Sequence, residues 1–174
     1  GDFSKLPAAL KVVLENMLRF EDGKTVHIDD IKAFSDWAKN GAKNPREIAY
    51  RPARVLMQDF TGVPGVVDLA AMRDAIKKAG GDPGRINPLT PVDLVIDHSV
   101  QVDYSGLFPD ARERNLEMEY KRNMERYKFL KWGQQSLDSF RAVPPGRGIV
   151  HQINLEWIAS VAREEEGIWM PDTL

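Results

Sequence analysis

Residues 51–64 read RPARVLMQDFTGVP. The apolar run at 53–59 predicts a β-strand, and the Thr61-Gly62 pair after it predicts a turn. Residues 64–79 then place apolar side chains at helical spacing and end at a Gly-Gly pair, which is typical of a helix C-terminus. A second apolar run at 92–97 predicts another strand. Strand, helix and strand in this order indicate the α/β class, a layered sheet with flanking helices.

Two amphipathic helices are predicted on the N-terminal side of this centre. The first places apolar residues at helical spacing from Leu10 to Leu18 and is stopped by Asp22-Gly23. The second begins after an Asp-Asp pair at 29–30 and ends near Gly41.

The C-terminal side alternates charged and loop-forming stretches. The charged segment at about 110–138 predicts one long helix. A Pro-Pro-Gly-Arg-Gly loop at 144–148 leads into 149–159, which we expect to be a strand end followed by a short helix. Residues 164–167 predict a polar turn, and Ile168 begins a further strand.

Composition limits the classes of protein that the chain can belong to. Its 174 residues fit one domain, and 43% hydrophobic with 29% charged residues excludes disordered and low-complexity proteins. The formal net charge of −2 gives no global basic field, so binding to nucleic acid or to an anionic membrane would need a local patch. No apolar run approaches the about 20 residues of a membrane-spanning helix, and we expect no membrane partner. Cysteine is absent, which excludes disulfides, a catalytic thiol and an iron–sulfur cluster ligated from within this chain.

The chain has three histidines, and two of them are candidates for catalysis. His98 follows Asp97 at the end of a predicted strand, where α/β sheets place ligand sites, and the carboxylate could hold the imidazole in one tautomer for proton transfer. His151 follows the glycine-rich loop, which suits the rim of a pocket. The alternatives stay open, because an Asp-His pair also occurs in turns and His151 could close a helix N-terminus. His27, just before a helix, has no acid or nucleophile pattern around it and is predicted to be structural.

Gln58 lies near the C-terminal end of the first predicted strand. Its amide can donate a hydrogen bond to a carboxylate or hydroxyl without a change of charge, although it could equally satisfy loop backbone. The glycines at 62–65 and 146–148 do not form a nucleotide-binding fingerprint. The scattered histidines give no metal-ligand spacing, so no metal site is expected from this chain alone.

Several stretches, in order along the chain, resemble aconitases of the bacterial and iron-regulatory-protein type. They are RPARVLMQDFTGVP at 51–64, VVDLAAMR at 66–73, Asn87-Pro88, DLVIDHSVQVD at 93–103, RYKFLKWG at 126–133 and HQINLE at 151–156. The resemblance covers nearly the whole chain, and several long motifs in the right order are far more specific than one short pattern.

The resemblance implies a hydro-lyase that interconverts citrate and isocitrate through cis-aconitate with a [4Fe–4S] cluster in the full-length protein. In such enzymes the glutamine of the Met-Gln-Asp motif contacts substrate, and that position is Gln58. The Asp-His pair used near the departing hydroxyl is Asp97 and His98. His151 would belong to a second His–Asp pair whose acid lies further along the polypeptide.

The chain also departs from the family. Family members are several times longer, and their cluster cysteines, catalytic serine and carboxylate-binding arginines belong to later segments. We therefore expect 1–174 to be a partial N-terminal aconitase-family domain, truncated at both ends relative to the family. It would supply one wall of the active site, be inactive alone and pack against the remaining domains of the same polypeptide. Arg147 stands where the family more often has a small polar residue.

An RNA-binding or regulatory module is the alternative function, because aconitases of this type include proteins that lose the cluster and bind RNA. The sequence offers a basic cluster at Lys121, Arg122, Arg126, Lys128 and Lys131. Glutamates interleave it, so a solvated helix face is the preferred interpretation. A naturally short protein that uses the fold for assembly is a third alternative. A reducing interior fits the absence of cysteine, and the expected location is cytoplasmic, with the mitochondrial matrix as the second choice.

Overall fold

A computed structural model describes residues 3–43 and 45–174. The chain divides into two compact units, Gly1–Pro52 and Ala53–Leu174, here called the N-terminal unit and the sheet unit. Each unit has a hydrophobic cluster of its own. No helix within the described residues is long and apolar enough to cross a membrane.

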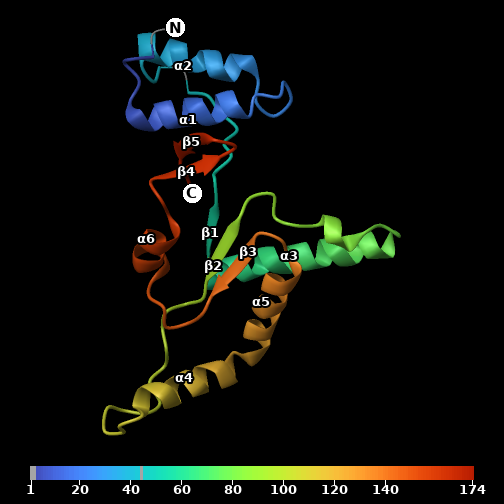
Figure 1. Cartoon of the computed structure of the whole chain (residues 1–174), viewed down its shortest axis with the longest axis vertical. Coiled ribbons are helices and arrows are strands. Elements are labelled where there is room, and N and C mark those ends of the chain that lie inside the picture. The colour runs from blue at the N-terminus through green and yellow to red at the C-terminus, as the bar shows by residue number, and fades with distance from the viewer. Residues whose placement is uncertain (1–2, 44) are drawn as a thin grey trace. The chain divides into compact units, whose positions relative to one another are not determined.

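The N-terminal unit is a pair of helices, α1 (Ala8–Arg19) and α2 (Ile28–Asn40), joined by a short loop (Figure 1). The two helices predicted in this region from apolar spacing are confirmed. Their buried apolar residues form one cluster, which consists of Leu6, Leu14, Met17, Val26, Ile31 and Phe34. The loop is ordered by Asp22, whose carboxylate accepts the backbone N–H groups of residues 24, 25 and 26.

The sheet unit is built on three parallel strands, β1 (Val55–Gln58), β2 (Val92–Val95) and β3 (Phe140–Val143), in the order β1-β2-β3. The α/β class is confirmed, and β1 and β2 fall inside the predicted strands. The register places Gln58 opposite Val95 and Val95 opposite Val143. The three strands therefore end side by side at one edge of the sheet.

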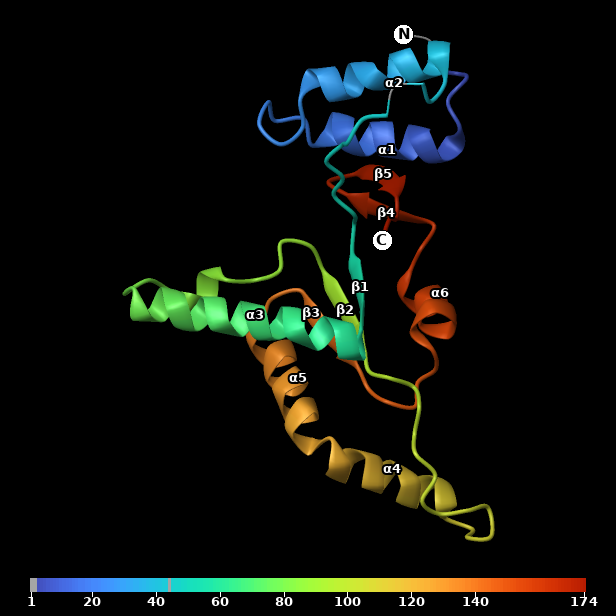
Figure 2. The ribbon, with the colours of Figure 1, turned by 180° about the vertical axis from the view of Figure 1, so that it is seen from behind.

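Two helices, α3 (Asp59–Lys78) and α5 (Met124–Ser136), pack against the sheet (Figure 2). Because side chains alternate along a strand, residues 92, 94 and 96 point to the same face of the sheet. They pack in a single core with one side chain each from α3, α5 and β3 and with Leu137, which directly follows α5. This core consists of Val66, Val92, Leu94, Ile96, Leu130, Leu137 and Phe140.

The predicted turn at Thr61-Gly62 is wrong, because α3 begins at Asp59 and includes both residues. Gly62 is explained by a close approach of the helix to the strands. A Cβ built on it would lie 2.7 Å from Cβ of Met57 and 3.0 Å from Cδ1 of Leu94. Glycine is here a packing residue inside a helix and not a breaker.

The predicted single helix at 110–138 is interrupted. It consists of α4 (Ala111–Arg122) and α5, separated by Asn123. The Asn123 side chain donates to the backbone carbonyl and to the carboxylate of Glu119, and such local bonds compete with helical hydrogen bonding. The segment after α5 turns at Ser139, which has a φ of 58°, into β3, a strand that the sequence pattern did not reveal.

The remaining elements are short. A 3₁₀ turn, η1 (Pro83–Arg85), follows α3, and η2 (Val150–Asn154), a single π-helical turn, runs into α6 (Leu155–Ile158). The strand end expected at 149 is therefore wrong, whereas the short helix is confirmed.

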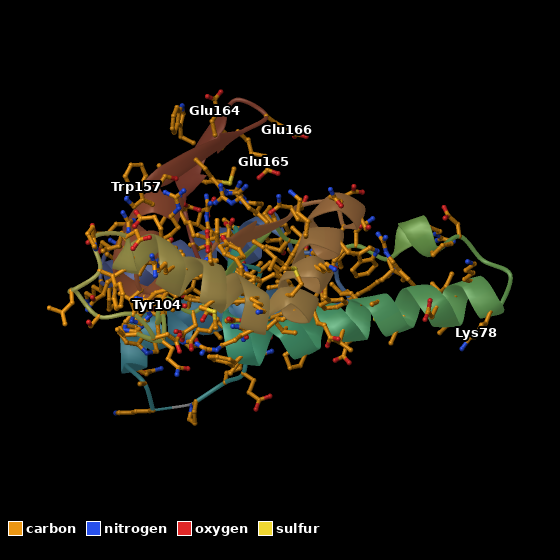
Figure 3. The ribbon with its side chains drawn as sticks, turned by 90° about the horizontal axis from the view of Figure 1, so that it is seen from below. Lys78, Tyr104, Trp157, Glu164, Glu165 and Glu166 are labelled. Atoms are coloured by element: carbon orange, nitrogen blue, oxygen red, sulfur yellow. The ribbon has the colours of Figure 1, made fainter. Side chains whose placement is uncertain are left out.

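An antiparallel hairpin of β4 (Ala162–Glu165) and β5 (Ile168–Pro171) completes the sheet unit. Glu164 and Glu165 belong to β4, so only Glu166 and Gly167 form the turn that we predicted over 164–167 (Figure 3). Both turn residues have positive φ, 53° and 80°, as a two-residue type I′ hairpin turn requires.

Candidate functional site

Gln58 and the Asp97–His98 pair lie at the same edge of the parallel sheet. Gln58 is the last residue of β1, and Asp97 and His98 follow the neighbouring β2 after Ile96. The side chains of Gln58 and His98 are exposed, whereas Asp97 is half-buried. Ligands of parallel α/β sheets bind at this carboxyl edge, and the arrangement presents an amide, a carboxylate and an imidazole there.

Asp97 is held as a carboxylate. Its Oδ1 accepts the backbone N–H of Ser99 at 2.7 Å, and this bond is the largest cause that lowers the pKa of Asp97 below its ordinary value. Burial opposes the shift, while the charges of His98 and Arg126 add to it. A carboxylate fixed next to His98 in the chain can orient the imidazole ring.

A buried carboxylate next to Gln58 was missed by the sequence analysis. Asp59, only 2% exposed, is the first residue of α3, and its Oδ2 accepts the backbone N–H of Asp97 at 3.1 Å. The same oxygen lies 3.2 Å from Nη1 of Arg126 on α5. An acidic residue directly after a strand was the available signal, but its partner lies far away in the sequence.

Arg126 is also a correction to the sequence analysis, which placed it on a solvated helix face. Its side chain is 21% exposed and pairs with Asp59. The guanidinium carbon lies 4.9 Å from the centre of the Phe60 ring and 5.3 Å from that of Tyr127, so aromatic contacts hold it from two helices.

His151 is held separately. It is an exposed residue of η2, and that turn is ordered by Asn154, whose Nδ2 donates to the carbonyl of Gly148 at 2.5 Å. Gly148 has a φ of 98°, and a Cβ there would lie 3.2 Å from Ile153. Within the described part of the chain, no hydrogen bond links His151 to Gln58, Asp97 or His98. That Gln58, Asp97, His98 and His151 together form one wall of an active site stays a prediction.

A cavity of about 450 Å³ lies beyond this edge. It is bounded by the segment after His98, by α4 and by the loop after β3. Its lining includes Val100, Arg112, Leu116, Tyr120, Pro145 and Arg147. None of the four predicted site residues is part of that lining.

The residues of this chain do not fit the ligands of an iron–sulfur cluster. Such clusters are held by cysteine thiolates, and the 174 residues contain no cysteine. Nor do the described residues contain three or more acidic, histidine or cysteine side chains placed to hold a metal ion.

Comparison with known proteins places these features in a family. The family model described as Aconitase family (aconitate hydratase) matches residues 28–174. Aconitate hydratase A of Salmonella typhimurium is 58% identical over 178 residues, that of Pseudomonas aeruginosa 60% and that of Escherichia coli 58%.

Each match covers 100% of this chain but only 19–20% of the relative. The chain therefore spans about a fifth of the length of these curated relatives. The resemblance inferred from the motifs is confirmed, and the chain belongs to the aconitase family.

Proposed function

We propose that this chain is part of an aconitate hydratase, a hydro-lyase that interconverts citrate and isocitrate through cis-aconitate, and that it supplies one wall of the active site. The observation that carries the proposal is the identity of 58–60% along the entire chain to proteins named aconitate hydratase A. The full-length enzyme would contain a [4Fe–4S] cluster whose thiolate ligands lie outside these 174 residues.

The sheet edge supplies the chemistry that this chain would contribute. Gln58 is exposed next to the end of β2, so its amide can donate to a carboxylate or hydroxyl of a tricarboxylic acid. His98, beside the ionised Asp97, would give or accept the proton at the hydroxyl or water that leaves or adds. His151 would serve as a second proton-transfer group from the rim, completed by an acid elsewhere in the polypeptide.

RNA binding is not favoured by the described contacts of the basic cluster. Arg122 makes two hydrogen bonds, of 2.5 and 2.6 Å, to the carboxylate of Asp103, and Arg126 pairs with Asp59. Two of the five cations are thus engaged within the chain, and the cluster is weaker as a phosphate-binding patch than the sequence alone indicates. The cytoplasmic location and the alternative of the mitochondrial matrix stay predictions.

The test of the proposed function is His98→Asn in the full-length enzyme, assayed with citrate, isocitrate and cis-aconitate. Loss of a proton-transfer group should lower kcat by about 100-fold to 10,000-fold while KM changes little, because the contribution is made in the transition state. His27→Asn is the matched control, since His27 lies at the N-cap of α2 in the N-terminal unit and asparagine is a favoured N-cap residue. Near-normal turnover of His98→Asn, or no hydratase activity in the parent enzyme, would refute the proposal.

A further inference from the structure

We infer that Asp59 and Arg126 are positioning residues that fix the chain at Gln58 and at the Asp97–His98 pair through one buried ion pair. The inference rests on the proposed function of the sheet edge. It concerns how that edge is held in place and adds two residues that do not themselves need to touch substrate.

Asp59 connects the two halves of the edge. It directly follows Gln58, so the start of α3 at Asp59 sets the direction of the chain at the end of β1. Its Oδ2 accepts the N–H of Asp97, a residue beyond the last ladder pair of β2. The backbone N–H of Ile96 still donates to the carbonyl of Val143 on β3, and the bond from Asp97 to Asp59 extends the order by one more residue, to the residue that precedes His98.

Arg126 brings a third element to the edge. It reaches Asp59 from α5, while the Phe60 ring of α3 and the Tyr127 ring of α5 lie within about 5 Å of its guanidinium. The carboxylate of Asp59 therefore joins three parts of the fold: the chain after β2, the first turn of α3 and the first turn of α5. A shift of either helix would move the Asp97 backbone.

The pair is poorly explained by stability alone. Within the described residues, Oδ1 of Asp59 and Nε of Arg126 are buried and have no hydrogen-bond partner. When a buried ion pair has incomplete hydrogen bonding, the desolvation penalty offsets much of its Coulombic attraction. Apolar residues of similar size often stabilise the fold equally well. What apolar residues could not supply is an acceptor for the Asp97 N–H and a positive charge close to the Asp97 carboxylate.

The charge around Asp97 is set by groups from each neighbouring element. They are Asp59 of α3, Arg126 of α5, and His98 and Ser99 of its own segment. The Arg126 cation lowers the pKa of Asp97. Replacing it with a neutral residue removes this effect and leaves the Asp59 anion uncompensated, and both changes raise the pKa of Asp97.

The test compares Asp59→Asn, Arg126→Gln and their double variant in the full-length enzyme. We expect kcat to fall by about 10-fold to 100-fold with KM within about threefold, because misplacement of a proton-transfer group acts on the transition state. In Arg126→Gln the acidic limb of the kcat/KM profile should move to higher pH. When Arg126→Gln is added to His98→Asn, kcat should fall by less than about a further twofold, because Arg126 acts through the Asp97–His98 pair.

A matched control is Asp103→Asn with Arg122→Gln, which breaks the exposed pair between α4 and the preceding loop and should leave kcat unchanged. A measurement independent of activity is amide hydrogen exchange at 96–99, expected to accelerate by about tenfold or more in Asp59→Ala. Unchanged kcat and unchanged exchange in the Asp59 variants would overturn the inference. It would also be overturned if Arg126→Gln lowered kcat by the same factor in His98→Asn as in the parent enzyme. If the parent enzyme shows no hydratase activity, the proposed function fails, and the exchange experiment alone decides whether Asp59 orders this edge.

Discussion

The edge that carries Asp97 and His98 and the turn that carries His151 are ordered in different ways. At the edge, parallel strands, the core under α3 and α5 and the Asp59–Arg126 pair all fix the backbone. The turn depends on the side chain of Asn154 and on the positive φ of Gly148. Long-range packing makes the first region part of the cooperative fold, whereas bonds between near neighbours allow the second to open by itself.

Gly62→Ala should have the largest effect, because it forces α3 away from β1 and β2. The added methyl would meet Cβ of Met57 at 2.7 Å, and overpacking against a strand should cost about 2 to 3 kcal/mol of unfolding free energy. Urea unfolding followed by circular dichroism measures the loss.

Gly65→Ala is the control on the same helix. Its Cβ would lie 3.8 Å from Cε of Met57, an ordinary contact, so the higher helix propensity of alanine should stabilise by about 0.5 kcal/mol. Equal destabilisation by both substitutions would show that Gly62 has no special packing role.

Asp172→Asn should weaken the hydrogen bonds by which the residue after β5 holds Ser160, after α6, and Arg54, before β1. Burial alone would raise the pKa of Asp172, but hydrogen bonds from Ser160 and from Arg54 outweigh it and hold the pKa below the ordinary value. Loss of these charge-assisted bonds should cost about 1.5 kcal/mol at neutral pH.

The pH dependence follows from the direction of that shift. A carboxyl whose pKa is lowered in the folded state adds its full contribution to the free energy of unfolding above its unfolded-state pKa of about 3.9. That contribution disappears as the pH falls through the pKa of the folded state. Stability of the parent and of Asp172→Asn should therefore converge below about pH 4. A constant difference across the titration would contradict this origin.

Asn154→Ala should cost about 1 kcal/mol, since the carbonyl of Gly148 loses its donor. The effect should be local, with faster amide exchange at 148–154 and unchanged exchange in β2. Gln152→Ala, at an exposed position of the same turn, is the control and should change neither. Accelerated exchange throughout the sheet would mean that the turn is part of the cooperative core after all.

Glu166→Asn should have the smallest effect and the opposite sign. Glu166 has a φ of 53° in the hairpin turn, and asparagine adopts this conformation more readily, so stability should rise by about 0.5 kcal/mol. Glu164→Asn, in the strand itself, should not stabilise. A rise in melting temperature for both would point to relief of charge repulsion and not to turn geometry.

The sequence predicted elements whose residues carry their own periodic pattern. Leu14 and Met17 indicated α1, and the apolar runs around Met57 and Leu94 indicated the two strands. β3 was missed because its four residues include the charged Arg141 and therefore form no apolar run. The start of α3 was not predicted because Gly62 is required by its close contacts with residues of two strands. A local sequence pattern does not contain these contacts.

For the site, the sequence supplied the side chains at strand ends but not what holds them. Gln58, Asp97 and His98 were predicted as candidates because parallel strands place their C-terminal residues at one edge, and their roles stay predictions. Asp59 and Arg126 were passed over because each, taken alone, is an ordinary charged residue. Their pairing exists only once α5 has packed beside α3.

The return of the C-terminal residues to the beginning of β1 has a consequence for folding order. Thr173 accepts hydrogen bonds from the backbone N–H groups of Ala53 and Arg54, and the bond from Ala53 to its hydroxyl spans 120 positions. Closing so long a loop costs more chain entropy than pairing β1 with β2, so we expect this contact to form after the sheet. During synthesis the sheet could therefore assemble first, and the hairpin would fasten to it once the ribosome has released residues 172 and 173.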